Sequence, residues 1–181
     1  MQDKEIFELF NNPSTREEAF KLIVKNYQER LYWHIRKIVI SHHDTDDVLQ
    51  NTFVRVWKGL NNFRWDAALY TWMYRIATIE SISFLEEKKR KTFGTGDDIE
   101  DILLRNLKAD EYFDGDIIQM QLQKAIVKLP GKQRIVFNMK YFDSMKYTEM
   151  AEILETSVGA LKASYHHAVK KIEETLRLEE V

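Results

Sequence analysis

The sequence predicts an all-α protein of two small helical domains, and three observations support that fold class. Apolar residues recur at spacings of three and four along most of the 181 residues, which is the period of an amphipathic helix. Only two prolines and six glycines are present to interrupt helices. Charge also divides the chain, because residues 93–118 carry 2 basic and 8 acidic side chains while the flanking segments are slightly basic. We therefore predict a domain at 1–92, an acidic linker at 93–116 and a second domain at 117–181.

Composition excludes several classes of protein. With 44% hydrophobic and 31% charged residues, the chain has the composition of a folded protein and not of a disordered one. Cysteine is absent, which excludes disulfides, thiolate zinc sites and a cysteine nucleophile. No run of 18 apolar residues occurs, and the acidic residues 1–5 lack the features of a signal peptide. We expect a cytoplasmic protein without membrane insertion.

The first domain begins with a long amphipathic helix over about 15–41. One stripe of apolar residues defines it, namely Phe20, Ile23, Val24, Tyr27, Leu31, Ile35 and Ile38. The polar segment 41–47 interrupts this helix. We expect Asp44 or Thr45 to cap the next helix, which runs to about Leu60.

A loop at residues 61–66 separates that helix from a third helical pattern. Its apolar residues again share one stripe, namely Leu69, Trp72, Met73, Ile76, Ile79, Ile82 and Leu85. The pattern continues into the basic run 88–91, so the first domain should contain three or four packed helices. Beyond it, residues 92–116 combine glycines and excess acid with one short apolar cluster. This predicts a linker that holds at most one weak helix.

The second domain contains four helical patterns. They cover about 117–128, 130–141, 146–154 and 157–177. Pro130 suits a first helical turn, since its missing N–H would have no partner there. Only Glu155 and Thr156 separate the last two patterns, and Ser157 is placed to cap the final helix. So short a turn before a helix with lysines on its polar face indicates a helix-turn-helix. A helical hairpin that only packs a core would give much the same pattern.

Two motifs in the first domain carry a family resemblance. Residues 46–57 read DDVLQNTFVRVW, and Phe63-Arg64 is followed at residues 71–77 by TWMYRIA. The first motif resembles the core-polymerase-binding helix in region 2 of bacterial RNA polymerase sigma factors. The second resembles the promoter-melting and minus-10 segment that comes next in those factors.

The second domain extends the resemblance in the same order. Residues 129–137 read LPGKQRIVF and residues 157–163 read SVGALKA, and both look like sigma region 4. The likeness covers about residues 16–177. It lacks full-length regions 1.1 and 3, which is typical of the extracytoplasmic-function (ECF) type of the sigma-70 family. The resemblance implies that region 2 is a helical bundle and region 4 a helix-turn-helix.

The resemblance implies that the helix over about 45–60 binds the clamp helices of the polymerase β′ subunit. Val48, Phe53, Val56 and Trp57 can supply its buried side, and an apolar group on the exposed face would mark a protein interface. The alternative is that Leu49 belongs to the core. The polymerase-binding residues that we expect are Asp47, Leu49, Gln50, Phe53 and Arg55.

The resemblance also implies that the loop 61–68 captures a flipped base of the minus-10 element. Unpaired bases stack on aromatic or guanidinium faces and offer their edges to polar side chains. Trp72 and Tyr74 fit a melting role by position, although aromatics at helical spacing more often belong to a core. The chain departs from the family at Ile79, where asparagine is common, and at Glu86-Glu87, where basic residues are common. The expected minus-10 contacts are Asn61, Asn62, Phe63, Arg64, Trp72, Arg75, Lys88 and Lys89.

The residues near the start of the final helix are the expected minus-35 readers, because that end of a recognition helix enters the major groove. Val158, Leu161 and Tyr165 are expected to lie more toward the inside, and lysines 162, 170 and 171 can pair with phosphates. Glu155 stands where related turns often carry glycine, and a left-handed backbone there would be strained by about 1 kcal/mol. The expected minus-35 contacts are Ser157, Val158, Gly159, Ala160, Lys162, Ala163, Ser164, His166, His167 and Lys170.

No catalytic or metal site is expected. The spacing of histidines and aspartates in residues 42–47 fits no metal motif, and helix capping in a solvated loop explains them. The sequence contains no G-x-S-x-G, no phosphate-binding glycine loop and no H-E-x-x-H. We therefore expect no cofactor and no enzymatic activity.

Together these inferences predict a sigma factor that directs core RNA polymerase to specific promoters. The partners that the resemblance implies are core polymerase, through the β′ clamp helices and the β flap, promoter DNA and an anti-sigma factor. Because the net charge is only −2, we expect the free protein to bind DNA weakly. Two alternatives stay open. One is a stand-alone dimeric regulator on a palindromic site, and the other is a helical adaptor that binds only proteins.

Overall fold

Helices account for the regular secondary structure of this chain. The computed structural model describes residues 3–64, 68–92, 96–111 and 116–179. Within these ranges no β-strand occurs, and the all-α class is confirmed.

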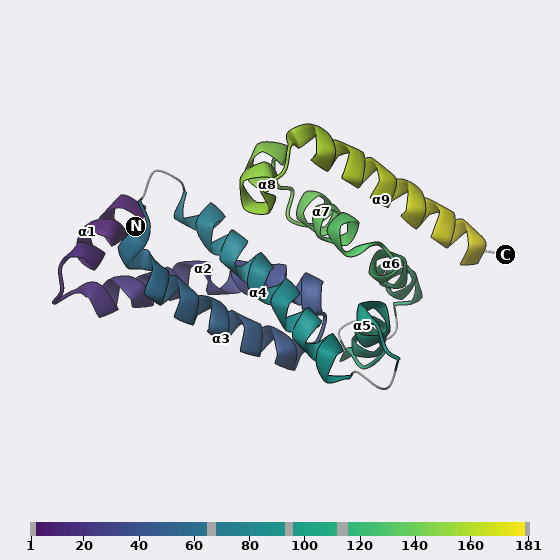
Figure 1. The fold of residues 1–181 in the computed structure, drawn as a ribbon, viewed down its shortest axis with the longest axis horizontal. Coiled ribbons are helices and arrows are strands. Elements are labelled where there is room, and N and C mark those ends of the chain that lie inside the picture. The colour runs from purple at the N-terminus through teal and green to yellow at the C-terminus, as the bar shows by residue number, and fades with distance from the viewer. Residues whose placement is uncertain (1–2, 65–67, 93–95, 112–115, 180–181) are drawn as a thin grey trace.

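The first unit is built around α2 (Arg16–Val39), the longest described helix. Three helices pack against it, namely α1 (Asp3–Asn11), α3 (His42–Gly59) and α4 (Leu69–Lys91), as Figure 1 shows. The predicted bounds of α2 and the predicted end of α3 agree with the structure to within about two residues. The start of α3 lies earlier than predicted. The fully buried members of the α2 stripe are Ile23, Leu31, Ile35 and Ile38.

Helix α1 precedes the helices that the sequence analysis identified. It buries Ile6 and Phe10 against α2, and the Tyr27 hydroxyl donates a hydrogen bond of 2.6 Å to Asp3 Oδ1. Burial and the neighbouring Asp3 carboxylate raise the pKa of Tyr27. The first unit is therefore a bundle of four helices within the described residues.

The start of α3 differs from the prediction. Ser41 is the cap, because its Oγ accepts a hydrogen bond of 3.2 Å from the Asp44 backbone N–H. The expected cap at Asp44 or Thr45 is wrong, and both side chains are buried. The reason lies in α2, which ends at Val39 with Ile40 as its C-cap at a positive φ of 67°. Ser41 follows in an extended conformation, which is the geometry that an N-cap requires.

The buried side of α4 differs from its apolar pattern, because it includes polar residues such as Thr78 and Ser81. Leu69, Met73, Ala77 and Leu85 are buried at steps of four and eight residues. Ile79 lies outside this stripe and is 48% exposed; Ile82, which also lies outside it, is 40% exposed. Helix α4 therefore presents apolar side chains beyond the core of its own unit.

The segment predicted to be a linker contains the helix α5 (Ile99–Lys108). Asp98 and Asp101 form a reciprocal capping box at its start, which satisfies two of the backbone N–H groups there. The helix buries Ile102, Leu103 and Leu107 and packs against α4 and α6 (Ile117–Val127). Instead of a weak helix, this part of the chain holds a capped helix with a buried face.

The second unit comprises α6, α7 (Gly131–Tyr141), α8 (Tyr147–Leu154) and α9 (Val158–Glu179). All four predicted helices are confirmed, and α9 packs along the other three. The predicted Ser157 cap is also confirmed, since Ser157 Oγ accepts a hydrogen bond of 3.2 Å from the Ala160 N–H. Pro130 immediately precedes the first residue of α7.

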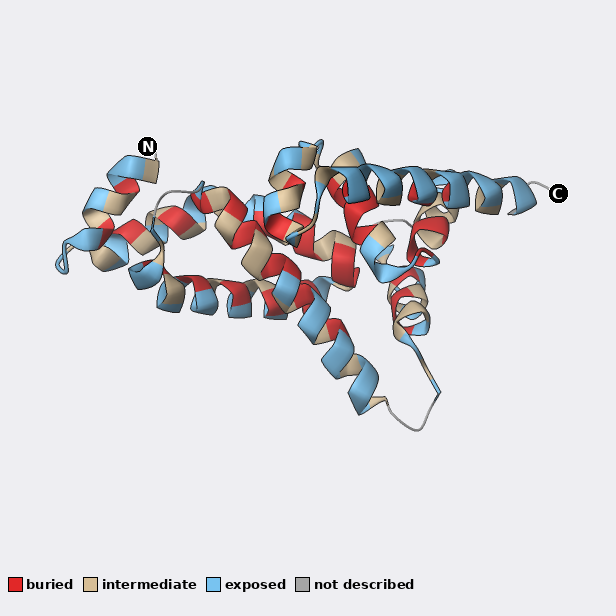
Figure 2. Ribbon diagram, turned by 45° about the horizontal axis from the view of Figure 1, so that its top comes forward, coloured by how far each residue is buried: buried red, intermediate tan, exposed pale blue. Residues whose placement is uncertain are grey.

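The two units pack against each other. Helix α4 lies against α8, and α2 lies against α7. Buried residues of both units belong to one continuous apolar cluster, which contains Ile38 and Met73 from the first unit and Met139 and Met150 from the second. Figure 2 shows the buried positions of the helices turned toward these contacts.

The docking of α5 can be tested by unfolding measurements. Leu103→Ala should lower the free energy of unfolding by about 2–5 kcal/mol, because it leaves a cavity at a fully buried site. Urea denaturation followed by circular dichroism measures the change. The exposed Lys108→Ala on the same helix is the control and should change stability by less than about 0.5 kcal/mol. Equal, small effects of both substitutions would mean that α5 is not docked.

Candidate functional site

The exposed face of α3 carries part of the predicted polymerase-binding set. Asp47 and Gln50 are exposed, whereas Leu49 is half-buried against the core. Phe53 is also half-buried and meets the Phe20 ring edge-on, with ring centroids 6.3 Å apart. The structure thus brings polar groups and two partly accessible apolar groups to one surface.

Arg55 lies on the same helix but is already paired. Its Nε is 2.5 Å from Glu80 Oε1 on α4, and the Glu80 side chain is only 11% exposed. Val48 and Val56 are fully buried, as predicted. Trp57, which was expected on the buried side, is 36% exposed and lies at the rim.

The predicted minus-10 residues separate into exposed polar groups and a packed aromatic pair. Asn61 and Asn62 are exposed in a short 3₁₀ turn, η1 (Leu60–Asn62), and Arg64 is exposed after it. Phe63 stacks on Trp72 with ring centroids 4.7 Å apart and planes at 27°. Residues 65–67 of the predicted loop lie outside the described residues.

Trp72 is half-buried. It is therefore neither fully exposed, as a role in melting would favour, nor fully part of the core. A Cβ atom added at Gly59 would come within 2.8 Å of Trp72 Cζ2, so the indole lies directly on the α3 backbone at this glycine. Tyr74, by contrast, belongs to the core. It is 3% exposed, stacks on His34 and donates a hydrogen bond to the Arg30 carbonyl.

The basic residues at the end of α4 differ in their pairing. Lys88 Nζ lies 2.5 Å from the buried Asp44 carboxylate, and Lys91 pairs with Glu87 at 2.7 Å. Lys89 is exposed. Of the two lysines expected to contact minus-10 DNA, Lys88 is therefore paired within the first unit.

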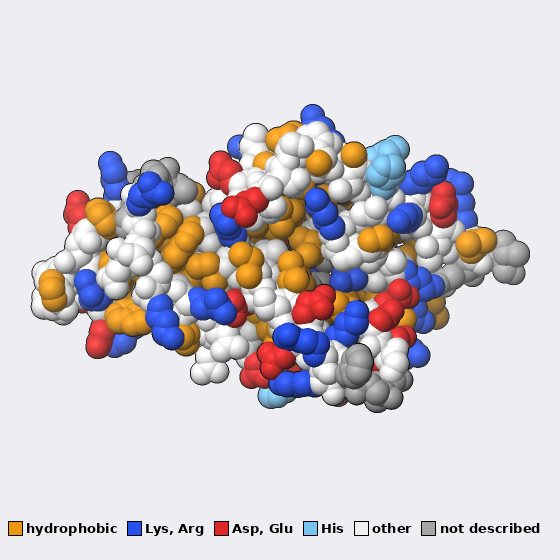
Figure 3. All heavy atoms as spheres, viewed as in Figure 1, with side chains coloured by type: hydrophobic (Ala, Val, Ile, Leu, Met, Phe, Trp, Pro, Cys, Tyr) orange, Lys and Arg blue, Asp and Glu red, His pale blue; other side chains and the backbone are white. Residues whose placement is uncertain are grey.

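Most of the predicted minus-35 residues lie on the exposed side of α9. Figure 3 shows histidine, lysine and arginine side chains along this face. Leu161 is fully buried, as expected, and Tyr165 is half-buried and stacks on Phe137. Val158 and Ser164 are half-buried. The exposed members are Ser157, Gly159, Ala160, Lys162, Ala163, His166, His167 and Lys170.

The turn between α8 and α9 contains a left-handed residue at the position where related turns often carry glycine. Glu155 has φ 49° and ψ 47°. Its carboxylate lies 2.5 Å from Arg75 on α4, so a predicted minus-10 residue is joined to the turn that leads into the predicted recognition helix.

Comparison with known proteins finds a family match in each of the two helical units. Residues 23–91 match the family Sigma-70 region 2, and residues 119–172 match Sigma-70, region 4. The chain belongs to the sigma-70 family. It is a transcription initiation factor and not an enzyme.

Individual relatives of this sigma factor cover nearly its whole length. It is 28% identical to the RNA polymerase sigma-H factor of Pseudomonas aeruginosa, over 97% of this chain and 94% of the relative. It is also 28% identical to the ECF RNA polymerase sigma factor SigW of Bacillus subtilis, over 89% and 90% of the two chains. The fold resembles the sigma factor RpoE of Bartonella quintana, solved with the anti-sigma factor NepR. The TM-score is 0.66 at 18% identity, over 88% of this chain and 98% of RpoE.

A buried polar cluster joins the two units of the sigma factor and was not expected from the sequence. Asp143, in the turn after α7, forms an ion pair with Lys37 of α2. The second oxygen of Asp143 lies 3.6 Å from His34 Nδ1. Asn138 donates a hydrogen bond of 3.2 Å to the Lys37 carbonyl. His34 falls on the apolar face of α2, between Leu31 and Ile35 in sequence, which is the one signal that could have marked it as buried.

Burial sets the protonation of this cluster. Burial lowers the pKa of His34, and the nearby Asp143 only partly offsets the shift. For Asp143, burial by itself would raise the pKa, but the His34 ring and the Lys37 ammonium outweigh it and hold the pKa below its ordinary value. His34 is therefore neutral and Asp143 ionised at neutral pH.

Two classes of site find no support among the described residues. No group of three or more histidine, aspartate or glutamate side chains there is arranged to hold a metal ion. None of the described helices combines the length and the apolar character needed to cross a membrane.

The contact between Gly59 and Trp72 gives a stability prediction. Gly59→Ala should destabilise the sigma factor by about 1–3 kcal/mol, because the new methyl group would displace the Trp72 ring and its stack with Phe63. The gain in helix propensity, about 0.5–1 kcal/mol, is too small to compensate. Thermal unfolding checks this. Gly159→Ala is the matched control, since open space surrounds its Cβ, and it should stabilise α9.

The cluster around His34 gives a pH dependence. The groups that face His34 are Asp143, Lys37, Tyr74 and Thr78. The pKa of His34 is lower in the folded state than in the unfolded state. The contribution of the neutral His34 ring to the free energy of unfolding is therefore complete above about pH 6.5, and it is lost as the pH falls below that value. Asp143, whose pKa is also lowered, adds a further loss below about pH 4.

This dependence can be measured as the free energy of unfolding between pH 7.5 and 5. The free energy of unfolding should decrease as the pH is lowered from 7.5 to 5. His34→Asn should flatten this pH dependence between pH 6.5 and 5. His166→Asn removes an exposed histidine and should leave the curve unchanged. A wild-type curve that is already flat would contradict the assignment.

Proposed function

We propose that this sigma factor divides promoter recognition between its two helical units. Residues 1–92 would hold core polymerase and the unpaired minus-10 strand, and residues 117–181 would read the minus-35 duplex. The observation that carries this proposal is the exposed start of α9 immediately after a three-residue turn, in the half of the chain that matches region 4. The polymerase would carry out catalysis, and the sigma factor would position the polymerase at the promoter.

The reading of the minus-35 element is assigned to α9. Gly159, Ala160 and Ala163 are small and exposed, so they allow the helix to approach the base edges closely. Lys162 and Lys170 project from the same helix and are suited to phosphates on either side of the groove. The β flap of the polymerase is the proposed protein partner of this unit.

The capture of the minus-10 element is assigned to the loop before α4. Asn61, Asn62 and Arg64 offer exposed hydrogen-bonding groups beside the Phe63–Trp72 stack. A flipped base could use the aromatic faces for stacking and the polar groups for its edge. Arg75 and Lys89 lie further along α4 for backbone contact.

Polymerase binding is assigned to α3. Asp47 and Gln50 are exposed, and Leu49 and Phe53 add apolar area beside them. This mixture of polar groups and apolar anchors is typical of a protein interface. Arg55 is held by Glu80, so it would present a fixed guanidinium to the β′ clamp helices.

The cellular setting follows from this function. We place the protein in the cytoplasm, where core polymerase and promoter DNA are found. An anti-sigma factor is the proposed regulator, supported by the RpoE relative that was solved with NepR. The net charge of −2 supports weak DNA binding until the sigma factor is mounted on polymerase.

Run-off transcription with purified core polymerase tests the proposal. Promoter-specific transcripts should appear only when the sigma factor is added. Lys170→Ala should weaken promoter binding most at low salt and reduce the slope of log affinity against log salt by about 0.9. Lys25→Ala on α2 is exposed, outside the proposed DNA surfaces, and serves as the control.

The other outcomes identify the alternatives. A footprint on DNA without initiation would indicate a stand-alone regulator. Association with polymerase without footprint or initiation would indicate an adaptor. Either result would overturn the proposed function.

A further inference from the structure

Helix α4 carries an exposed isoleucine one turn beyond two of the proposed minus-10 contacts. Ile79 is 48% exposed, although Thr78 and Ser81 beside it on the helix are buried. The proposed contacts Trp72 and Arg75 precede Ile79 by seven and four positions. Residues at these spacings share one face of a helix. Ile79 therefore continues the surface of α4 that is proposed to meet the promoter.

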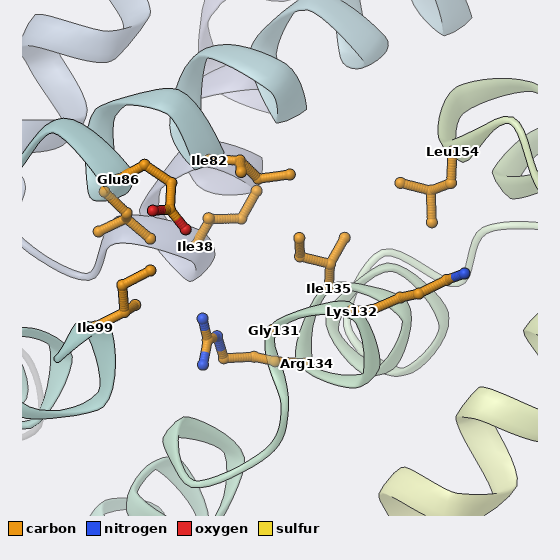
Figure 4. Close-up of a pocket in the computed structure, with 10 residues that line it drawn as sticks. Ile38, Ile82, Glu86, Ile99, Gly131, Lys132, Arg134, Ile135 and Leu154 are labelled. Atoms are coloured by element: carbon orange, nitrogen blue, oxygen red, sulfur yellow. The ribbon is translucent and has the colours of Figure 1, made fainter. Parts of the chain in front are cut away.

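A second exposed isoleucine on α4, Ile82, has different surroundings. Ile82 lines an open cleft of about 310 Å³ and faces Ile135 and Leu154 of the second unit, as Figure 4 shows. The described residues that line this cleft do not include Ile79. Contact with the second unit accounts for the apolar side chain at Ile82, and it does not account for the one at Ile79.

The acidic neighbour of Ile79 is turned away from this surface. The Glu80 carboxylate lies 2.5 Å from Arg55 Nε on α3, and only 11% of the Glu80 side chain is exposed. A carboxylate that is paired in this way repels a phosphate backbone less than an unpaired one, because the guanidinium offsets its charge. The surface at Ile79 is therefore apolar, and the adjacent negative charge does not exclude DNA from it.

The distance between Trp72 and Ile79 indicates which base pairs Ile79 can reach. An α-helix rises 1.5 Å per residue, so Ile79 lies about 10 Å beyond Trp72 along α4. When the helix runs along the DNA, that distance spans about three base steps of 3.4 Å. The Phe63–Trp72 stack is the proposed site of a flipped base. Ile79 would then lie against the duplex that borders the opened bases.

An aliphatic side chain can favour only one kind of base edge in a paired duplex. The major groove admits an α-helix, and there thymine presents a C5-methyl group beside its polar atoms. Isoleucine offers no hydrogen bond, so it would displace water from polar base edges without replacing the lost hydrogen bonds. Contact with a methyl group instead removes apolar surface from water on both sides. The chemistry of Ile79 therefore matches thymine.

We propose that Ile79 is a specificity-determining residue, which selects a thymine in the duplex beside the opened minus-10 bases by contact with its C5-methyl group. This inference rests on the proposed function for the assignment of α4 to minus-10 DNA, and it adds the base, the chemical group and the residue that reads it. Asparagine is common at this position in the family, and an asparagine reads the polar edge of adenine instead.

The base preference is measured first by selection from a library. Holoenzyme formed from this sigma factor and core polymerase is mixed with duplex fragments whose minus-10 segment is randomised, and the bound fragments are sequenced. Wild type should select a thymine about three base pairs from the flipped base. Ile79→Asn should lose that preference and keep the others, because the remaining contacts are unchanged.

Replacement of the selected thymine by deoxyuridine isolates the contact, since it removes only the methyl group. This change should weaken binding to wild-type holoenzyme about fourfold, which corresponds to one buried methyl-sized group. It should have no effect on Ile79→Asn holoenzyme. Ile79→Val retains a branched apolar side chain and should retain most of the effect. At the same position, 5-methylcytosine should bind wild type more tightly than cytosine does.

Ile82→Asn is the matched control, because it makes the same substitution at the other exposed isoleucine of α4. Its ratio of affinities for thymine and deoxyuridine should equal that of wild type. A fragment with the minus-35 element alone should bind wild-type and Ile79→Asn holoenzyme equally. Circular dichroism checks that each variant is folded.

The outcomes separate this proposal from the proposed function. If wild type initiates transcription from the selected promoter but deoxyuridine binds as well as thymine, the role of Ile79 is overturned and the function stands. An equal loss in wild type and Ile79→Asn would place the methyl contact at another residue and would also overturn it. If the methyl dependence is found but no transcript is made, the role of Ile79 is supported and the proposed function fails. If holoenzyme selects no sequence at all, both are overturned.

Discussion

Burial of α2 on several sides is the constraint on which the rest of the structure depends. Its apolar stripe is covered by α1, α3 and α4, while its C-terminal half carries His34 and Lys37 to the second unit. A helix buried on several sides fixes the positions of all its neighbours at once, because each gains stability only by matching the same side chains. The surfaces of α3 and α4 are therefore presented in a defined orientation.

Charge pairing explains how a protein with little net charge can still present basic surfaces. Lys88 is paired with buried Asp44, and Arg55 with nearly buried Glu80. These pairs lie beside the core and hold their helices together. Exposed residues such as Lys89 and Lys170 then remain for a partner. We therefore expect the free protein to have low affinity for phosphate, since only part of the positive charge faces solvent unpaired.

The interdomain boundary combines polar contacts with an imperfect apolar seam. Asp143 and Glu155 both lie in turns of the second unit, and both pair with long helices of the first. Domain interfaces of mixed polarity are typical of units that move relative to one another. An open cleft of about 310 Å³ lies along the same boundary, with Ile82 of the first unit facing Ile135 of the second (Figure 4).

Local patterns were sufficient to predict the helices and the type of fold. The spacings of three and four determined α2, α3, α4 and the four helices of the second unit, and the sequence motifs in their order determined the sigma-70 family. The Ser157 cap was predictable because capping depends on residues within three positions. The Ser41 cap was missed because its position depends on where α2 ends, at Ile40.

Pairings between distant residues were decided only by the tertiary structure. Nothing in the sequence near Glu155 indicates Arg75, and nothing near Asp143 indicates His34, because these contacts join residues about 80 and 110 positions apart. The contact between the Trp72 ring and Gly59 likewise depends on how α3 and α4 pack against each other. The sequence by itself determined most of the helices, the Ser157 cap and the family, since these follow from neighbours along the chain. The closed arrangement of the units depends on packing across the chain, which no local pattern encodes.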